Sequence, residues 1–408
     1  FFFLTNTLLF VWWSVRKQFL GGTTLSEKLL YSFSVERYIG YLLIINFITL
    51  WLLIDFVGFP EASGGFMQGD SMMFQISYFT QGIKVFTLVL FSLFLYGGRL
   101  YFVKSFFFSY ADLKTNKVIP NYRFLEYFLL LAYAVGFTLL LVSSAHLIGV
   151  ALAMEALSFC LYLLTAFKTE SKYSLEAAVK YFFYGAVVFG FFACGTLFIY
   201  LSVGGLSFDH ILANTPTYYS FDCTALYLGK ESILYDADKG SLFFMAGVFL
   251  ILTSLIFKVG GAPFHFWVAD VYEGAPYPTT AFMASIGKVG FYSILFKLCA
   301  WLFVSTLIEW QFVLLGAGAL SLVIGSLGAL KQKRIKRFFA YSSIVHVGFL
   351  LIALGIGDHN FISATVLYDA PQSMFITNSL ISALLYLFVY VITVLLMFLV
   401  LMNLAFKK

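Results

Sequence analysis

Long apolar runs fill most of this chain and restrict it to a lipid environment. A helix needs roughly 20 apolar residues to cross ~30 Å of hydrocarbon, and 61% of the 408 residues are hydrophobic while only 11% are charged. The runs lack the two-residue alternation of barrel strands, which favours helices. The sequence therefore predicts an all-α polytopic membrane protein with about eleven spans, at residues 1–15, 39–58, 73–98, 124–143, 147–167, 177–203, 241–268, 278–305, 311–330, 338–356 and 376–403.

Basic residues gather on alternate loops, as the positive-inside rule requires of a chain with many spans. The basic loops and tails cover residues 16–38, 99–123, 168–180, 331–337 and 407–408. The loops between them are acidic, which predicts an N-terminus on the outer side and a C-terminus on the basic inner side. One segment breaks the pattern, because 269–277 should be basic and contains only Asp270 and Glu273.

Charged residues inside the predicted spans are the strongest candidates for function. A lysine at bilayer mid-depth costs about 2.5–3.5 kcal/mol, so Lys258 and Lys288 need a compensating role. Glu155 is the one acid central to a predicted span, and it must be either protonated or paired with a cation there. Lys297 and Lys84 also fall within spans. We expect Lys297 to snorkel toward an interface, and Lys84 to serve local packing or contact a lipid headgroup.

Lys258 has the strongest functional case, because its helix is expected to break directly after it. Gly260, Gly261 and Pro263 follow closely, and a proline removes a backbone donor and clashes with the preceding turn. Helices broken at this depth are tolerated where the backbone lines a hydrated cavity, as in ion-coupled transporters. We expect Lys258 to load and release a proton under the influence of Glu155. A structural ion pair joining two helices is the alternative.

Three further polar residues could extend a proton path. Lys288 stands beside Ser285 and Gly287, whose small size leaves room for water or a close helix, although its long side chain could instead snorkel. Imidazole exchanges protons near neutral pH, so His265 and His346 could bridge proton sites. Satisfied core histidines are the alternative for both.

Several classes of function lack their motifs in this sequence. The cysteines are scattered without a CxxC pair, so no iron–sulfur or zinc site is expected from this chain alone. They are Cys160, Cys194, Cys223 and Cys299. No phosphate loop, dinucleotide fingerprint or hydrolase motif is present, and we expect neither a resident cofactor nor nucleic-acid binding.

Three stretches resemble one family. KVGGAPFHFWVADVYEGAPYPTTAFMASIGKV resembles the seventh-to-eighth helix signature of the antiporter-like subunits of respiratory complex I, in the branch of mitochondrial subunit 2 and the bacterial N subunit. ALKQKRIKRFFAYSSIVHVGFLLIAL is similar to that family's ninth-to-tenth helix connection, and MEALSFCLYLLTAF with SLEAAVKYFFYGA to its fifth and sixth helices. The resemblance covers residues 150–355.

The resemblance implies a role for each candidate residue. Glu155 falls on the family's fifth-helix glutamate, Lys258 on the lysine of the broken seventh helix, and Lys288 on the eighth-helix lysine. His265 and His346 match polar positions of the same hydrophilic axis. The implied activity is proton translocation coupled to electron transfer elsewhere in the complex.

The resemblance also implies an inverted-repeat fold, of which this chain matches only part. Full-length members have two five-helix repeats and a further lysine near the end, so the second repeat is expected to lack its last three helices. We expect accessory helices in 1–123, a first repeat in 124–305 and a partial second repeat in 306–408. Either the sequence is incomplete or a second polypeptide supplies the missing helices, docked beside 376–403.

The leading hypothesis is a proton-translocating subunit in the membrane arm of complex I. We expect it in the mitochondrial inner membrane, with the bacterial plasma membrane as the alternative. Flavin, iron–sulfur clusters and quinone are expected in other subunits, with lipids and neighbouring antiporter-like subunits as partners. A stand-alone cation/proton antiporter and a structural membrane subunit without transport are the alternative functions.

Overall fold

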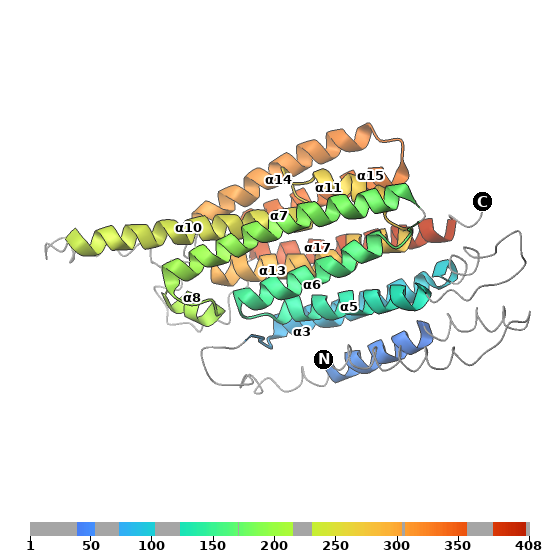
Figure 1. The fold of residues 1–408 in the computed structure, drawn as a ribbon, viewed down its shortest axis with the longest axis horizontal. Helices are drawn as coiled ribbons and strands as arrows, with labels where there is room; N and C mark the ends of the chain where they lie inside the picture. Colours follow the sequence, from blue (N-terminus) through green and yellow to red (C-terminus); the bar gives the residue numbers. More distant parts are fainter. Residues whose placement is uncertain are drawn as a thin grey trace, which may run out of the picture.

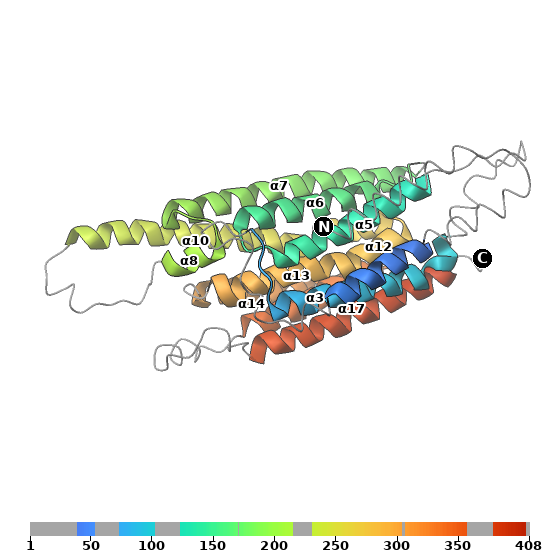
Figure 2. The same ribbon diagram turned by 90° about the horizontal axis from the view of Figure 1, so that it is seen from below.

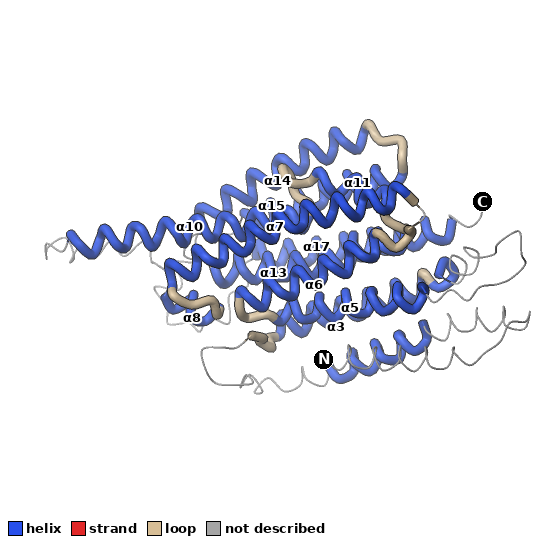
Figure 3. Tube along the Cα trace, viewed as in Figure 1, coloured by secondary structure: helices blue, strands red, loops and turns tan. Residues whose placement is uncertain are grey.

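Helices make up every regular element that the structure describes. The computed structural model describes residues 39–53, 73–102, 123–169, 171–214, 231–303, 307–356 and 378–404, and the class predicted from sequence, all-α, is confirmed (Figure 3). Within these ranges nine helical stretches are long and apolar enough to cross a membrane, and Ile39–Leu53 is shorter. The span predicted at 1–15 lies outside the described residues. The three-part division of the chain stays a prediction: 1–123, 124–305 and 306–408.

The long helices lie side by side along the longest axis of the molecule (Figures 1 and 2). In chain order they and the shorter helices are α3 (Tyr78–Gly97), α5 (Arg123–Ser143), α6 (Leu147–Thr165), α7 (Lys172–Val203), α8 (Phe208–Asn214), α10 (Glu231–Val259), α11 (Phe266–Gly274), α12 (Tyr277–Phe282), α13 (Lys288–Lys297), α14 (Leu307–Leu330), α15 (Ile335–Gly355) and α17 (Asn378–Leu404).

The stretch Tyr277–Ala300 forms the centre of the bundle. Every residue from Pro278 to Cys299 is buried, and α13 packs against α3, α5, α10 and α17. Two π-helical turns interrupt it, Met283–Gly287 directly before Lys288 and Leu298–Leu302 directly after Lys297. Because π-turns are rare and frequent at functional sites, the irregular backbone marks both lysines of the central helix.

The structure contains the predicted helix break, but the helices on either side begin and end at different residues from those predicted. α10 ends at Val259 and the chain resumes helical structure in α11, so the single span expected at 241–268 is two helices with a break between them. The sequence also predicts a loop between spans at 269–277, and this is wrong over most of that length, because α11 continues to Gly274. Its acidic side chains find partners on neighbouring segments, which allows this short segment to stay helical.

Glycines let two pairs of helices approach closely. A Cβ atom on Gly195 of α7 would lie 2.9 Å from the carbonyl oxygen of Gly247 in α10, and the reverse contact is also 2.9 Å. Gly348 of α15 has the same relation to Gly318 of α14, at 2.9 Å. Small residues are the usual means of bringing helix backbones together in a membrane, where no hydrophobic effect drives association.

This packing predicts that Gly195→Ala destabilises the protein. The added methyl group must displace α10, and overpacking of this kind typically costs about 1–3 kcal/mol. Gly190→Ala is the matched control, because Gly190 lies on the same helix with nothing near its Cβ position. We expect a lower apparent melting temperature for Gly195→Ala only. Equal melting temperatures for the two variants would contradict the close packing.

Candidate functional site

The break after α10 is held by side chains that satisfy its backbone. Gly260 has a φ of 88°, a left-handed conformation that glycine adopts without strain. The amide of Ala262 donates to Ser321 Oγ at 2.7 Å, and Trp267 Nε1 donates to the carbonyl of Phe257 at 3.1 Å. Irregular backbone survives at membrane depth only when protein groups or water satisfy it, so these contacts explain how the break is stable.

Lys258 lies buried at the end of α10, with its side chain 1% exposed. Its Nζ donates to Ser158 Oγ at 2.7 Å and lies 3.5 Å from Glu155 Oε2. The structure thus places Glu155 and Lys258 together, as the expected pair requires, while their part in proton transfer stays a prediction. Ser158 was not among the candidate residues identified from the sequence, although its position three residues after Glu155 puts it on the same face of α6.

Aromatic rings enclose this pair. Tyr162 packs edge-on against Tyr181 with 4.7 Å between ring centroids, and Tyr181 stacks on Trp267 at 4.7 Å. Gly185 of α7 leaves the space that the Tyr162 hydroxyl fills. The apolar ring surfaces reduce water around the Lys258 ammonium, so its electrostatic attraction to Glu155 is stronger than at a surface.

A second cluster surrounds Lys288 in the middle of the bundle. Lys288 Nζ donates to the Tyr390 hydroxyl of α17 at 3.2 Å. His346 of α15 shares a 2.7 Å hydrogen bond through Nδ1 with the Tyr386 hydroxyl, and its ring centroid is 4.8 Å from that of Tyr390. Lys288 is only 3% exposed, so the snorkelling alternative is wrong for this lysine.

Tyr272 of α11 lies near one residue of each cluster. These residues are Tyr181, which is near Glu155, and Tyr390, whose hydroxyl accepts from Lys288. Its hydroxyl is buried and faces Ser343 of α15 outside hydrogen-bond geometry. A buried hydroxyl in this position can exchange hydrogen bonds with either neighbour or with water.

His265 is not brought into either cluster by any contact of the described residues. It stands at the N-terminal end of α11, partly buried, beside the backbone of Pro263. Its role as a proton relay stays a prediction. Lys297 is also not where it was expected, because it is 2% exposed and donates to the carbonyl of Ser144 at 2.6 Å. The expectation that Lys297 snorkels to an interface is therefore wrong.

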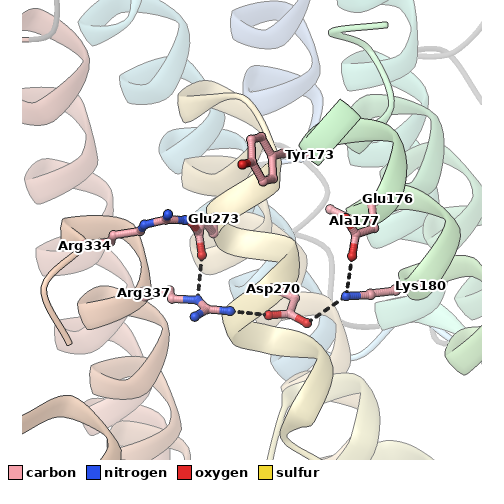
Figure 4. Close-up of a pocket in the computed structure, with 9 residues that line it drawn as sticks. Tyr173, Glu176, Ala177, Lys180, Asp270, Glu273, Arg334 and Arg337 are labelled. Atoms are coloured by element: carbon pink, nitrogen blue, oxygen red, sulfur yellow. Dashed lines mark hydrogen bonds and ion pairs between the residues drawn. The ribbon is translucent and has the colours of Figure 1, made fainter. Parts of the chain in front are cut away.

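The acidic segment that broke the charge pattern is neutralised by neighbouring basic residues (Figure 4). Arg337 contacts both acids, at 2.6 Å from Asp270 and 2.6 Å from Glu273. Lys180 of α7 lies 3.3 Å from Asp270, while Arg334 pairs with Glu273. The cluster lines a pocket of about 220 Å³. The cluster joins the half-helix α11 to α7 and α15. The acids Asp270 and Glu273 therefore stand on the basic side because they form ion pairs with neighbouring helices.

A membrane bundle with a buried lysine–carboxylate pair beside a helix break has the features of an ion-coupled transporter. The chain belongs to the NADH:quinone oxidoreductase/Mrp antiporter transmembrane family, whose model matches residues 144–407. This match confirms the family to which the sequence was found to be similar.

Individual relatives carry the same family name. The chain is 33% identical over 260 residues to NADH-quinone oxidoreductase subunit N of Mycobacteroides abscessus, covering 63% of this chain and 45% of that protein. It is 38% identical over 242 residues to NADH-ubiquinone oxidoreductase chain 2 of Metridium senile, covering 59% of this chain and 56% of that protein. The chain therefore spans about half the length of these curated relatives.

Solved structures share the fold. A chain of respiratory complex I from Thermus thermophilus aligns with a TM-score of 0.63 and 26% identity, over 98% of this chain and 70% of that chain. A chain of the Mrp complex from Dietzia sp. aligns with a TM-score of 0.66 and 15% identity, over 93% and 62% respectively, which shows the fold alone. The predicted antiporter-like polytopic fold is confirmed.

The ion-pair cluster predicts that Asp270→Asn loosens α11. The substitution leaves Arg337 and Lys180 without their shared carboxylate, and exposed pairs of this kind contribute about 0.2–1 kcal/mol each. Glu176→Gln is the control, because Glu176 pairs with Lys180 one helical turn away on the same helix and is 60% exposed. Limited proteolysis should cut Asp270→Asn faster near α11 than the parent protein. We expect this difference at both low and high salt concentrations. Identical cleavage of the two variants would contradict a clamp.

Proposed function

We propose that this chain is a proton-translocating, antiporter-like subunit in the membrane arm of an NADH:quinone oxidoreductase. The observation that carries the proposal is the contact between Lys258 and Glu155 directly at the break between α10 and α11. Intramembrane ionisable residues that face a bundle interior mark ion pathways by default. Family membership and the names of the relatives support the class of complex.

Lys258 would act as the proton-loading group. A buried lysine holds its proton while a carboxylate lies beside it and gives it up more readily when that carboxylate withdraws or is neutralised. Ser158 keeps the ammonium oriented through its 2.7 Å hydrogen bond. Because Gly260 and the backbone after it are not helical, a small movement of the break can change the distance between Lys258 and Glu155.

Lys288 would receive the proton and pass it along the bundle. Tyr272 lies near one residue of each lysine cluster, and the hydroxyl of Tyr390 contacts Lys288 directly. His346 continues the cluster toward Tyr386. Alternating lysine and hydroxyl groups supply both donors and acceptors, which a proton path through buried protein requires.

The redox chemistry would belong to other subunits. Among the described residues no group of His, Cys, Asp or Glu is arranged to hold a metal ion. We propose that flavin, iron–sulfur clusters and quinone lie elsewhere in the complex, and that neighbouring antiporter-like subunits and lipids surround this chain. The mitochondrial inner membrane is the proposed location, with the bacterial plasma membrane as the alternative. The relatives include chain 2 of Metridium senile as well as bacterial subunit N.

Substitution of Lys258 tests the proposal. Lys258→Met removes the proton carrier, and Lys258→Arg keeps the positive charge beside Glu155 but does not deprotonate in a protein. In the purified complex reconstituted in vesicles, both variants should show a large loss of protons translocated per NADH oxidised. The control is Ser254→Ala, one turn earlier in α10, whose hydroxyl is buried against its own helix.

The outcomes separate the proposed function from the alternatives. A structural ion pair predicts that Lys258→Arg pumps normally, and that result would overturn a proton-carrying role. A purified preparation without flavin and iron–sulfur subunits would instead favour a stand-alone cation/proton antiporter.

We also propose that a second polypeptide packs beside 376–403. One face of α17 presents exposed apolar side chains at helical spacing: Ile381, Leu385, Val389, Ile392 and Leu396. A photo-reactive residue at Leu385 in the intact complex should form an adduct with another protein chain. The control position is Ala383, which is fully buried. Adducts with lipid alone at Leu385 would refute this proposal.

A further inference from the structure

Lys297 is a buried cation that the proposed path does not use. It ends α13 with 2% of its surface exposed. Its Nζ donates to the carbonyl of Ser144 at 2.6 Å and lies 5.3 Å from the ring centroid of Phe208. The π-helical turn Leu298–Leu302 follows it directly. A buried lysine whose direct contacts are one neutral carbonyl and a ring has a weaker stabilising environment than Lys258, which contacts a carboxylate.

The position of Lys297 is the acidic end of the bundle. The segments around it are the connection between α5 and α6 and the start of α8, which pair through their backbones. In the charge pattern these connections lie on the outer, acidic side. Lys297 follows Lys288 by nine residues, about 13 Å along a helix that rises 1.5 Å per residue.

Nine residues also turn the helix through about two and a half turns, so Lys297 faces away from the side that carries Lys288. Ser293 and Gly290, four and seven residues earlier, share the face of Lys297. A Cβ atom on Gly290 would lie 3.3 Å from Thr138 of α5. Small and hydroxyl-bearing residues therefore continue from Lys297 into the bundle along this face of α13.

The charged groups around Lys297 come from two other helices. Lys84 of α3, which is partly buried, and Asp209 of α8, which is exposed, both interact electrostatically with it. Lys297 therefore has one like charge, on Lys84, and one opposite charge, on Asp209, in its surroundings. His146 lies in the same connection as Ser144 and accepts a hydrogen bond from the amide of Ile148, and burial lowers its pKa, so it adds no positive charge at neutral pH.

We propose that Lys297 is a third proton-carrying lysine of this chain, through which protons leave toward the acidic face past Asp209. The Lys297 amine accepts a proton arriving along the Ser293 face of α13, becomes an ammonium, and releases the proton to water beside Asp209. No other bond forms or breaks. This inference rests on the proposed function, because it assumes that protons reach the interior lysines.

A purely structural role is the alternative, and Lys336 shows what such a role looks like. At the opposite, basic end of the bundle, Lys336 Nζ donates to the carbonyl of Ala275 at 2.6 Å and lies 4.1 Å from the ring centroid of Tyr277. These contacts match those of Lys297 in kind. Lys336 is therefore the control for the effect of removing a lysine that caps a carbonyl.

The test compares Lys297→Gln, Lys297→Arg and Lys336→Gln in the intact complex reconstituted in vesicles. The glutamine amide can still donate to the Ser144 carbonyl, and arginine keeps the charge without releasing a proton. We expect both Lys297 variants to lose most of the protons translocated per NADH oxidised while NADH oxidation continues in detergent. Lys336→Gln should keep the parent ratio.

Each contrary result is decisive. Normal pumping by Lys297→Arg shows that a fixed positive charge suffices, and this result overturns the inference. The arginine variant gives this answer even if Lys297→Gln fails to assemble. An equal loss in Lys336→Gln overturns it too, because carbonyl capping then explains both lysines. Lys258→Met in the same type of preparation separates a failure of this inference from a failure of the proposed function. If Lys258→Met lowers the number of protons translocated per NADH oxidised and the Lys297 variants do not, only the inference about Lys297 fails. If none of these variants lowers that number, the proposed function fails as well.

Discussion

The buried ammonium of Lys258 is the interaction on which the rest of the site depends. An uncompensated charge at this depth is strongly unfavourable. The 3.5 Å contact with Glu155 and the 2.7 Å hydrogen bond that Lys258 Nζ donates to Ser158 Oγ compensate it. Both partners come from α6, so the lysine also fixes how α6 and α10 face each other. Removal of one partner leaves a buried charge unpaired, which is why pairs of this kind are sensitive to small movements.

The break after α10 makes such movements possible without loss of the fold. Ser321 and Trp267 satisfy backbone groups that a continuous helix would have used, and the half-helix α11 is tied to α7 and α15 by Asp270 and Glu273. The non-helical backbone of the break is therefore followed, on the inner side, by a half-helix held by ion pairs. Fixed elements around one adjustable contact are the arrangement that ion-coupled transporters use.

Some of this could be predicted from sequence and some could not. The helical class, the break and the pair of Glu155 with Lys258 follow from local rules, because a spanning chain with one mid-span acid has few ways to compensate a buried lysine. Tyr390 could not be identified, since it is one of 26 tyrosines and no spacing relates α17 to Lys288. The burial of Lys297 depends on how distant connections fold over the end of α13, which hydropathy does not record.

The most direct test of the pair is a double-mutant cycle on proton translocation with Glu155→Gln, Lys258→Met and the two combined. Residues that act as one unit are strongly non-additive in such cycles. If Glu155 works by controlling the proton on Lys258, each single variant should lose about as much coupled proton translocation as the double variant. Losses that multiply independently would show that the two residues act apart, and would contradict the pair as the proton-loading group.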